Sequence, residues 1–76
     1  MWIKINTIDI VKSFVEICSR YKKSDIDVIQ DRYVINGKSI LGIFSLNLVE
    51  QVNVNINSED ENTKAEFYNE IQKWRI

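Results

Sequence analysis

The chain has 76 residues, of which 45% are apolar and 28% charged, which predicts one small globular domain over residues 1–76. Ten basic against eleven acidic residues argue against nucleic acid as the main partner, because phosphate binding requires a clustered positive surplus. The chain has no histidine and two glycines, which excludes an imidazole acid, base, phosphoryl acceptor or zinc ligand, a dinucleotide fingerprint and a P-loop.

The remaining composition predicts where the protein works. No apolar run approaches the ~18 residues of a membrane span, and the first residues lack the charged start and apolar stretch of a signal peptide. The lone Cys18 cannot form an internal disulfide. We therefore expect a cytoplasmic protein with no membrane partner, no metal and no cofactor. The abundance of isoleucine, asparagine and lysine is typical of an AT-rich bacterial genome, which fits a Firmicute.

The first part of the chain predicts a strand followed by an amphipathic helix. Residues 2–6 alternate in part between apolar and polar side chains. Between residues 7 and 22, apolar residues recur at steps of three and four and so share one helical face: Ile10, Val11, Phe14, Ile17, Cys18 and Tyr21. Asn6 or Thr7 can cap this helix, and Asp9 adds a carboxylate near its positive end. On that apolar face, Cys18 is expected to be a buried thiol.

The middle of the chain predicts a hairpin and a very short helix. Residues 26–30 and 33–35 form the two strands around a turn at Asp31-Arg32, and Asn36-Gly37 ends the second strand. Residues 39–46 are too few and too apolar for a free-standing helix. We expect one or two helical turns there, capped by Ser39 and packed against the sheet.

The last part of the chain contains the clearest strand. In residues 52–57, three β-branched residues alternate with asparagine, so one face is buried and the other faces water. Ser58-Glu59-Asp60-Glu61 then matches a capping box that opens the final helix. The inner face of that helix carries Phe67, Tyr68, Ile71 and Trp74. The resulting order, βαββαβα, predicts an α+β open-faced β-sandwich with helices on one side of an antiparallel sheet.

Residues 38–46, Lys-Ser-Ile-Leu-Gly-Ile-Phe-Ser-Leu, form the most specific motif in the chain. This segment resembles the regulatory serine segment of HPr, the small phosphocarrier of the sugar phosphotransferase system, and of its relative in Firmicutes, the catabolite-repression HPr. The register extends over essentially the whole chain, with one extra residue within 22–24. The resemblance implies an HPr-like fold, a four-stranded antiparallel sheet with three helices on one face.

The resemblance also implies that the carrier residue is missing. HPr carries its phosphoryl group on the histidine of a His-Ala-Arg-Pro segment that caps the first helix. That segment falls on residues 7–10 of this chain, so Thr7 occupies the position of the histidine and Asp9 that of the arginine. A threonine hydroxyl is a poor nucleophile without a base, and Asp9 would repel a phosphate. We therefore expect no enzymatic or phosphocarrier chemistry, and Thr7 to act as a helix cap.

Ser39 is the strongest functional candidate. In the family, the serine of this motif is phosphorylated by HPr kinase. A phosphate there would add ~1.5–2 negative charges at a helix N-terminus, where anions are tolerated. Lys38 could pair with such a phosphate. A simple helix cap explains the same serine, and the sequence leaves both interpretations open.

The apolar residues after Ser39 predict a partner surface. Ile40, Leu41, Ile43 and Phe44 cannot all face inward from so short a helix, and exposed apolar patches mark interaction sites. In the family, this surface binds the transport enzymes, HPr kinase and the catabolite control protein. We expect Ile40 and Phe44 to face outward.

The leading hypothesis is thus a non-catalytic, protein-binding HPr-like regulator, with HPr kinase and a catabolite-control-type repressor as its partners. Two alternatives stay open. One is a phosphocarrier of the phosphotransferase system with a non-histidine acceptor such as Thr7. The other is a nucleic-acid-binding α+β module, because the order βαββα also occurs among RNA-binding domains.

Overall fold

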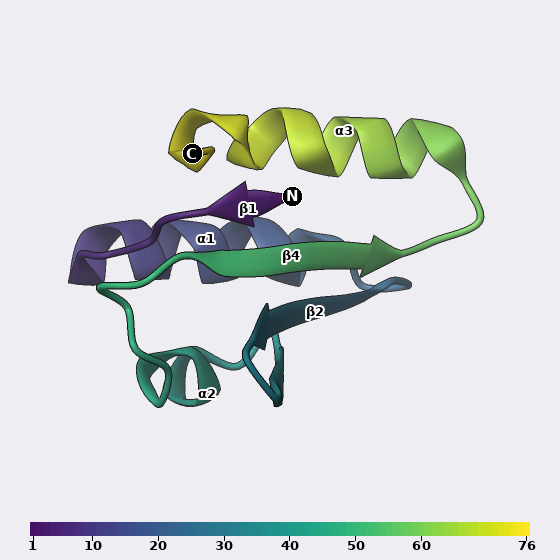
Figure 1. Ribbon diagram of the computed structural model, residues 1–76. Coiled ribbons are helices and arrows are strands. Elements are labelled where there is room, and N and C mark those ends of the chain that lie inside the picture. Colours follow the sequence, from purple (N-terminus) through teal and green to yellow (C-terminus); the bar gives the residue numbers. More distant parts are fainter.

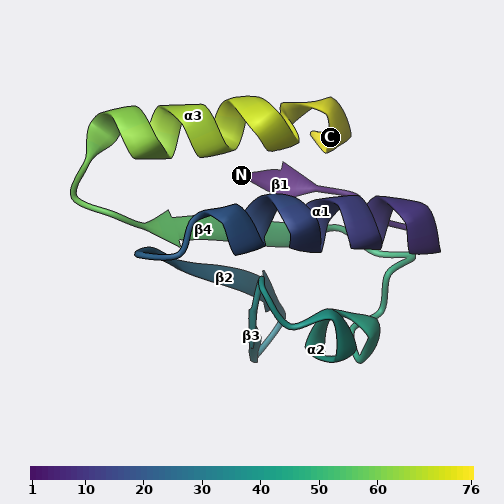
Figure 2. The same cartoon turned by 180° about the vertical axis from the view of Figure 1, so that it is seen from behind.

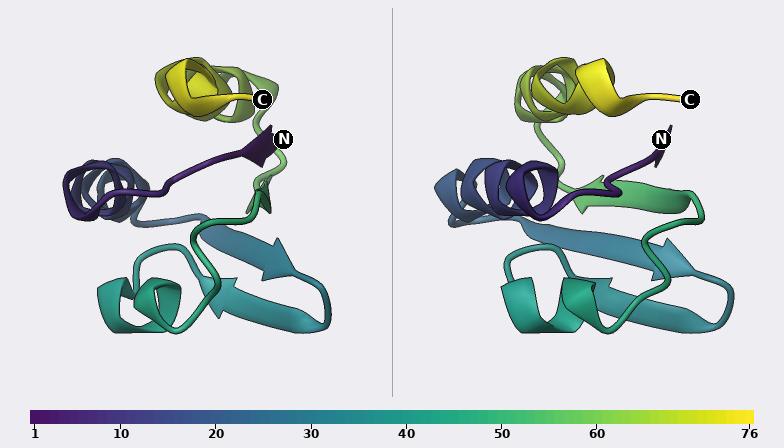
Figure 3. Two further views of the ribbon diagram at one scale, coloured as in Figure 1. Left: turned by 60° about the vertical axis from the view of Figure 1, so that its left-hand side comes forward. Right: turned by 90° about the vertical axis from the view of Figure 1, so that its left-hand side faces the viewer.

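The computed structural model describes all 76 residues and forms one four-stranded sheet with helices on one of its faces (Figures 1 and 3). The strands lie in the order β1-β4-β2-β3, and every neighbouring pair is antiparallel. The α+β open-faced arrangement expected from the sequence is confirmed. In chain order the elements are β1 (Trp2–Ile3), α1 (Ile8–Arg20), β2 (Asp25–Gln30), β3 (Tyr33–Asn36), α2 (Ile40–Phe44), β4 (Val52–Asn57), α3 (Glu61–Ile71) and the 3-10 turn η1 (Gln72–Trp74).

Helix α1 forms where the apolar periodicity predicts it. Its N-cap is Thr7, whose side-chain oxygen accepts a hydrogen bond from the Ile10 N–H at 3.1 Å. The helix stops at Arg20, and the N–H of Tyr21 closes the last turn by donating to the Cys18 carbonyl at 3.1 Å. The helix is thus slightly shorter than the range 7–22 predicted from periodicity.

The hairpin turns at Asp31-Arg32 as predicted. Gln30 pairs with Tyr33, so the turn contains only two residues, and Asp31 adopts φ 54°. Aspartate is among the few non-glycine residues that tolerate this left-handed backbone region. β3 ends at Asn36, and a Cβ on the following Gly37 would lie only 2.8 Å from Cγ2 of Ile26. A side chain at this position would therefore displace the β2 core.

The core lies between the sheet and the helices. Phe14 of α1 and Phe67 of α3 are its largest fully buried side chains. Each makes an edge-to-face contact with a further aromatic ring: Phe14 with Trp74 at 6.3 Å and Phe67 with Tyr21 at 5.3 Å between ring centroids. These contacts hold the two long helices against the same apolar layer.

The start of the chain and the start of α3 differ from the sequence prediction. Strand β1 contains only two residues, and its other edge pairs with the C-terminal segment through a bridge between Ile3 and Arg75, in which the Lys4 N–H donates to the Trp74 carbonyl at 3.0 Å. The capping box at Ser58 is wrong. Asp60 caps α3, and its carboxylate accepts from the N–H groups of residues 62 and 63 at 2.9 and 3.4 Å. The Ser58 hydroxyl instead accepts from the Asp60 N–H at 3.1 Å.

Candidate functional site

Ser39 stands at the exposed start of α2. Its side-chain oxygen accepts a hydrogen bond from the Gly42 N–H at 3.1 Å, and its own N–H donates to the Asn36 carbonyl at 2.9 Å. The backbone at Ser39 is extended, with φ −99° and ψ 101°, as an N-cap requires. The predicted cap is confirmed. The residue is exposed, so its hydroxyl lies at the protein surface while it holds the helix.

The motif requires a glycine three residues after Ser39, because Gly42 lies very close to β3. A Cβ at this position would lie 2.7 Å from Cγ2 of Ile35 and 3.0 Å from the Ser39 hydroxyl oxygen. The first distance is shorter than real Cβ contacts allow. A glycine three residues after the serine therefore lets α2 lie directly against β3 while its N–H bonds to the cap.

The outward face of α2 differs in one residue from the prediction. Ile43 is fully buried and Ile40 packs partly against the core, whereas Leu41 is 81% and Phe44 41% exposed. Residues three apart share a helical face, so Ile40 and Ile43 form the inner stripe. Leu41 and Phe44 form the outer stripe. The prediction for Phe44 is confirmed, and Leu41 takes the outward place expected for Ile40.

The Lys38 side chain points toward the loop before β2. Its ammonium donates to the Ser24 carbonyl at 2.8 Å, in the loop that precedes β2. The expected pairing of Lys38 with a phosphate on Ser39 stays a prediction, and in the unphosphorylated chain the ammonium is bonded to this carbonyl. The lysine charge also favours the ionised form of the nearby Cys18 thiol, but burial outweighs it and raises the Cys18 pKa to about 12. The expected buried, unreactive thiol is confirmed.

The first turn of α1 lies at the same end of the molecule as α2 (Figures 1 and 2), and Thr7 is the N-cap of that turn. The oxygen of Thr7 is already an acceptor for the Ile10 N–H, and Asp9 occupies the same helical turn. Ile8 beside it is 62% exposed. This end of the fold therefore carries the Thr7 hydroxyl, which caps α1, and the Asp9 carboxylate, together with exposed apolar side chains.

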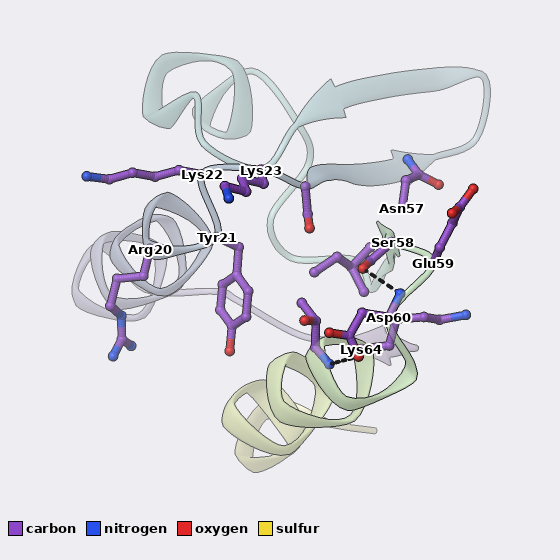
Figure 4. A pocket seen from close by; sticks show the side chains of 12 residues that line it. Arg20, Tyr21, Lys22, Lys23, Asn57, Ser58, Glu59, Asp60 and Lys64 are labelled. Carbon is purple, nitrogen blue, oxygen red and sulfur yellow. Dashed lines mark hydrogen bonds between the residues drawn. The ribbon is translucent and has the colours of Figure 1, made fainter.

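An open hollow lies between the end of α1 and the start of α3. This open cavity of about 1000 Å³ is lined mainly by polar residues from positions 20–24 and 56–64 (Figure 4). Its lysines do not converge, because Lys22 and Lys64 extend in opposite directions (Figure 4). The sequence reasoning did not identify this cavity, since its two segments meet only in the folded chain.

Tyr21, Arg20 and Glu70 form a polar cluster between α1 and α3. The Tyr21 hydroxyl donates to the Glu70 carboxylate, which Arg20 also contacts at 2.9 Å. Burial, followed by this hydrogen bond and the negative charge of Glu70, raises the Tyr21 pKa. The cluster joins α1 to α3 and is structural. No group of three or more histidine, cysteine, aspartate or glutamate side chains could hold a metal ion, and no helix is long and apolar enough to cross a membrane.

The comparisons with known proteins agree with this geometry. The family described as PTS HPr component phosphorylation site matches residues 10–74. HPr-C-His from Thermoanaerobacter tengcongensis superposes with a TM-score of 0.75 at 26% identity, over 96% of this chain and 90% of that chain. Crh, the Bacillus subtilis catabolite repression containing protein, has the same fold, with a TM-score of 0.68 at 23% identity over 97% of this chain and 87% of that chain. No curated protein matches.

The family match begins at residue 10, directly after Thr7 and Asp9. Members of this family are phosphocarriers that interact with other proteins of the phosphotransferase system, and they are not enzymes. The match covers most of the sequence, and the superposition extends over nearly all of the fold. This chain therefore belongs to the HPr family.

Proposed function

We propose that the protein is a regulatory, non-carrier member of the HPr family that acts in the cytoplasm. It binds partner proteins through the outer stripe of α2 and is switched by phosphorylation of Ser39 by HPr kinase. One observation carries this proposal: Ser39 is exposed within an intact motif, in a chain that has no histidine. The phosphorylated form is proposed to bind a catabolite-control-type repressor.

The chemistry at α1 supports the non-carrier half of the proposal. Without a histidine, the chain cannot form the phosphoramidate through which the family transfers phosphoryl groups. Thr7 has its oxygen bonded to the Ile10 N–H, and the Asp9 carboxylate lies in the same turn. A negative charge at this place repels an incoming phosphate. Both substitutions thus oppose phosphoryl transfer.

The surroundings of Ser39 support the regulatory half. The hydroxyl is exposed, and it stands at the start of the helix that bears Leu41 and Phe44. A phosphate on Ser39 adds ~1.5–2 negative charges and three strong acceptor oxygens beside this apolar stripe. Such a change alters the partner that the same surface prefers. The serine and the stripe therefore form one switchable surface.

The exposed apolar side chains at this end support a protein partner. Leu41 is 81% exposed, and Ile8 of α1 is 62% exposed at the same end of the fold. An apolar patch of this kind on a small protein marks an interaction site. It also fits the family, whose members bind other proteins of the phosphotransferase system.

The proposal is tested by titrating ¹⁵N-labelled protein, with and without phosphate on Ser39, with a catabolite control repressor. We expect shifts that centre on residues 39–44 and require the phosphate. Leu41→Ser should abolish binding, whereas Val49→Ser, at a loop position 72% exposed, should leave it unchanged. Binding that ignores Ser39 phosphorylation, or that Val49→Ser weakens as much as Leu41→Ser, would contradict the proposal.

A further inference from the structure

The one Asn-Gly step in the chain, Asn36-Gly37, lies where β3 ends and the turn toward Ser39 begins. Asn-Gly is the dipeptide most prone to deamidation, because glycine has no side chain to obstruct its backbone nitrogen. That nitrogen loses its proton and attacks the side-chain amide carbon of the asparagine, a succinimide ring closes, and the side-chain nitrogen leaves as ammonia. Water then opens the ring to aspartate or to isoaspartate, in which the backbone runs through the former side chain.

The surroundings explain why both residues of this step are present. A Cβ at position 37 would lie 2.8 Å from Cγ2 of Ile26 and 3.2 Å from the Cys18 sulfur, so a side chain does not fit there. The Asn36 side-chain oxygen accepts a hydrogen bond from the Lys38 N–H at 2.9 Å and so helps to form the turn. The fold thus requires the glycine and uses the asparagine, and a chemically labile pair results.

The folded chain opposes the first step of this chemistry in two ways. The Gly37 N–H donates to the Ile26 carbonyl at 2.7 Å and continues the ladder between β2 and β3. Asn36 is itself the last residue of β3 and pairs with Asp27. Ring closure requires the Asn36 Cβ and the Gly37 nitrogen to eclipse each other about the Cα–C bond, and an extended backbone holds them far from this arrangement. Attack therefore requires the end of β3 to open.

We infer that Asn36 is a site of spontaneous deamidation that the end of β3 holds in check, so that the reaction proceeds only from a locally opened state. Asn36 is exposed, so water reaches the succinimide and ammonia leaves freely once the strand end has opened. The hydrogen bond from Gly37 to Ile26 is therefore part of the barrier at this site. The reaction needs only water, and it does not require a phosphate on Ser39.

The two products affect the turn before α2 differently. Aspartate keeps a side-chain oxygen that accepts from the Lys38 N–H. Isoaspartate inserts a methylene group into the backbone between residues 36 and 37, and the original carbonyl becomes a free carboxylate. The hydrogen bond from the Ser39 N–H to the Asn36 carbonyl, 2.9 Å long in the intact chain, is then lost. Isoaspartate should therefore destabilise the start of α2, whereas aspartate should not.

The test compares the folded protein with the chain unfolded in guanidinium chloride, at the same neutral pH and temperature. Trypsin releases the peptide of residues 33–38, in which Asn36 is the one asparagine, and mass spectrometry follows its deamidation. The folded protein should deamidate at least about tenfold more slowly than the unfolded chain. Hydrogen exchange of the Gly37 amide measures the opening itself, and its protection should be of the same order of magnitude as the slowing of deamidation.

Refolding of the aged chain tests the effect on the turn. The isoaspartate form, identified by its reaction with isoaspartyl methyltransferase, should unfold at a lower urea concentration than Asn36→Asp, which should unfold like wild type. Asn36→Ser, which keeps an acceptor but has no amide, controls for damage elsewhere and should retain its stability after the same treatment. Equal deamidation rates in the folded and unfolded chains would overturn the inference. So would a Gly37 amide without protection, or an isoaspartate form as stable as Asn36→Asp.

Discussion

The Ser39 hydroxyl oxygen accepts a hydrogen bond from the Gly42 N–H, and this 3.1 Å contact closes the first turn of α2. The serine caps the helix, while the glycine lets that helix lie against Ile35 of β3. The same two residues therefore build the short helix and present the hydroxyl at its exposed start. This one turn therefore stabilises α2 and also carries the hydroxyl that we propose as the regulatory site.

Gly42→Ala tests the close approach of α2 to the sheet. The new Cβ would lie 2.7 Å from Cγ2 of Ile35, which belongs to a short, stiff side chain. We expect a loss of ~1–3 kcal/mol in the free energy of unfolding, more than the ~0.5–1 kcal/mol that alanine gains over glycine in a helix. Urea unfolding measures the difference, with the exposed Ser13→Ala as control. An unchanged or raised stability of Gly42→Ala would contradict this packing.

Two substitutions of Ser39 test its role as the cap of α2. Ser39→Ala removes the acceptor for the Gly42 N–H and should cost ~1 kcal/mol of stability. Ser39→Asp keeps an acceptor that caps as well as serine and should cost little. Urea unfolding of the two variants gives both values. Equal losses in the two variants would show that the hydroxyl does not stabilise α2.

The buried Cys18 thiol predicts how stability changes in alkali. Burial raises its pKa from 9.0 to about 12 in the folded protein, so the unfolded chain releases this proton first. Folding stability is therefore intact below about pH 9 and is lost as the pH rises toward about 12. Tyr21, whose pKa is also raised, acts in the same direction. Urea unfolding at increasing pH measures the loss.

The same burial predicts that the folded protein resists iodoacetamide at neutral pH, whereas the urea-unfolded chain reacts. Mass spectrometry reads both results from one experiment. Rapid labelling of the folded protein would show that Cys18 is accessible and that its pKa is not raised by burial.

The absence of histidine predicts that phosphoenolpyruvate and the first enzyme of the phosphotransferase system leave the intact mass unchanged. If Thr7 and Asp9 occupy the carrier segment, Thr7→His combined with Asp9→Arg should gain one phosphate in this assay. Thr7→His alone should gain less, because Asp9 still repels the donor. A phosphate on the wild-type chain would show that a residue other than histidine accepts it.

Periodic patterns predicted the elements that bury a whole face. Helix α1 follows from apolar steps of three and four, and β4 from valine and isoleucine alternating with asparagine. The Ser39 cap was predictable as well, because its chemistry acts within one turn of the chain. These features depend on local spacing, which is visible in the sequence.

The structure differs from the sequence prediction, or adds to it, where residues that are far apart in the chain come into contact. Leu41 rather than Ile40 faces outward because the sheet fixes how a five-residue helix is rotated. The Lys38 ammonium donates to the Ser24 carbonyl, fourteen positions away in the chain, a contact that local spacing does not show. The alignment of Trp2 with Val34 across the sheet was hidden for the same reason, because only the strand register brings these residues into line.

Incubation of the protein with HPr kinase and ATP, with the intact mass recorded beside that of Ser39→Ala, tests whether Ser39 is the regulatory site. We expect one phosphate on wild type and none on the variant. Ser45→Ala, which changes the second exposed serine of the same motif, should accept one phosphate like wild type. An unchanged wild-type mass, or a phosphate that survives in Ser39→Ala, would contradict the assignment of Ser39 as the regulatory site.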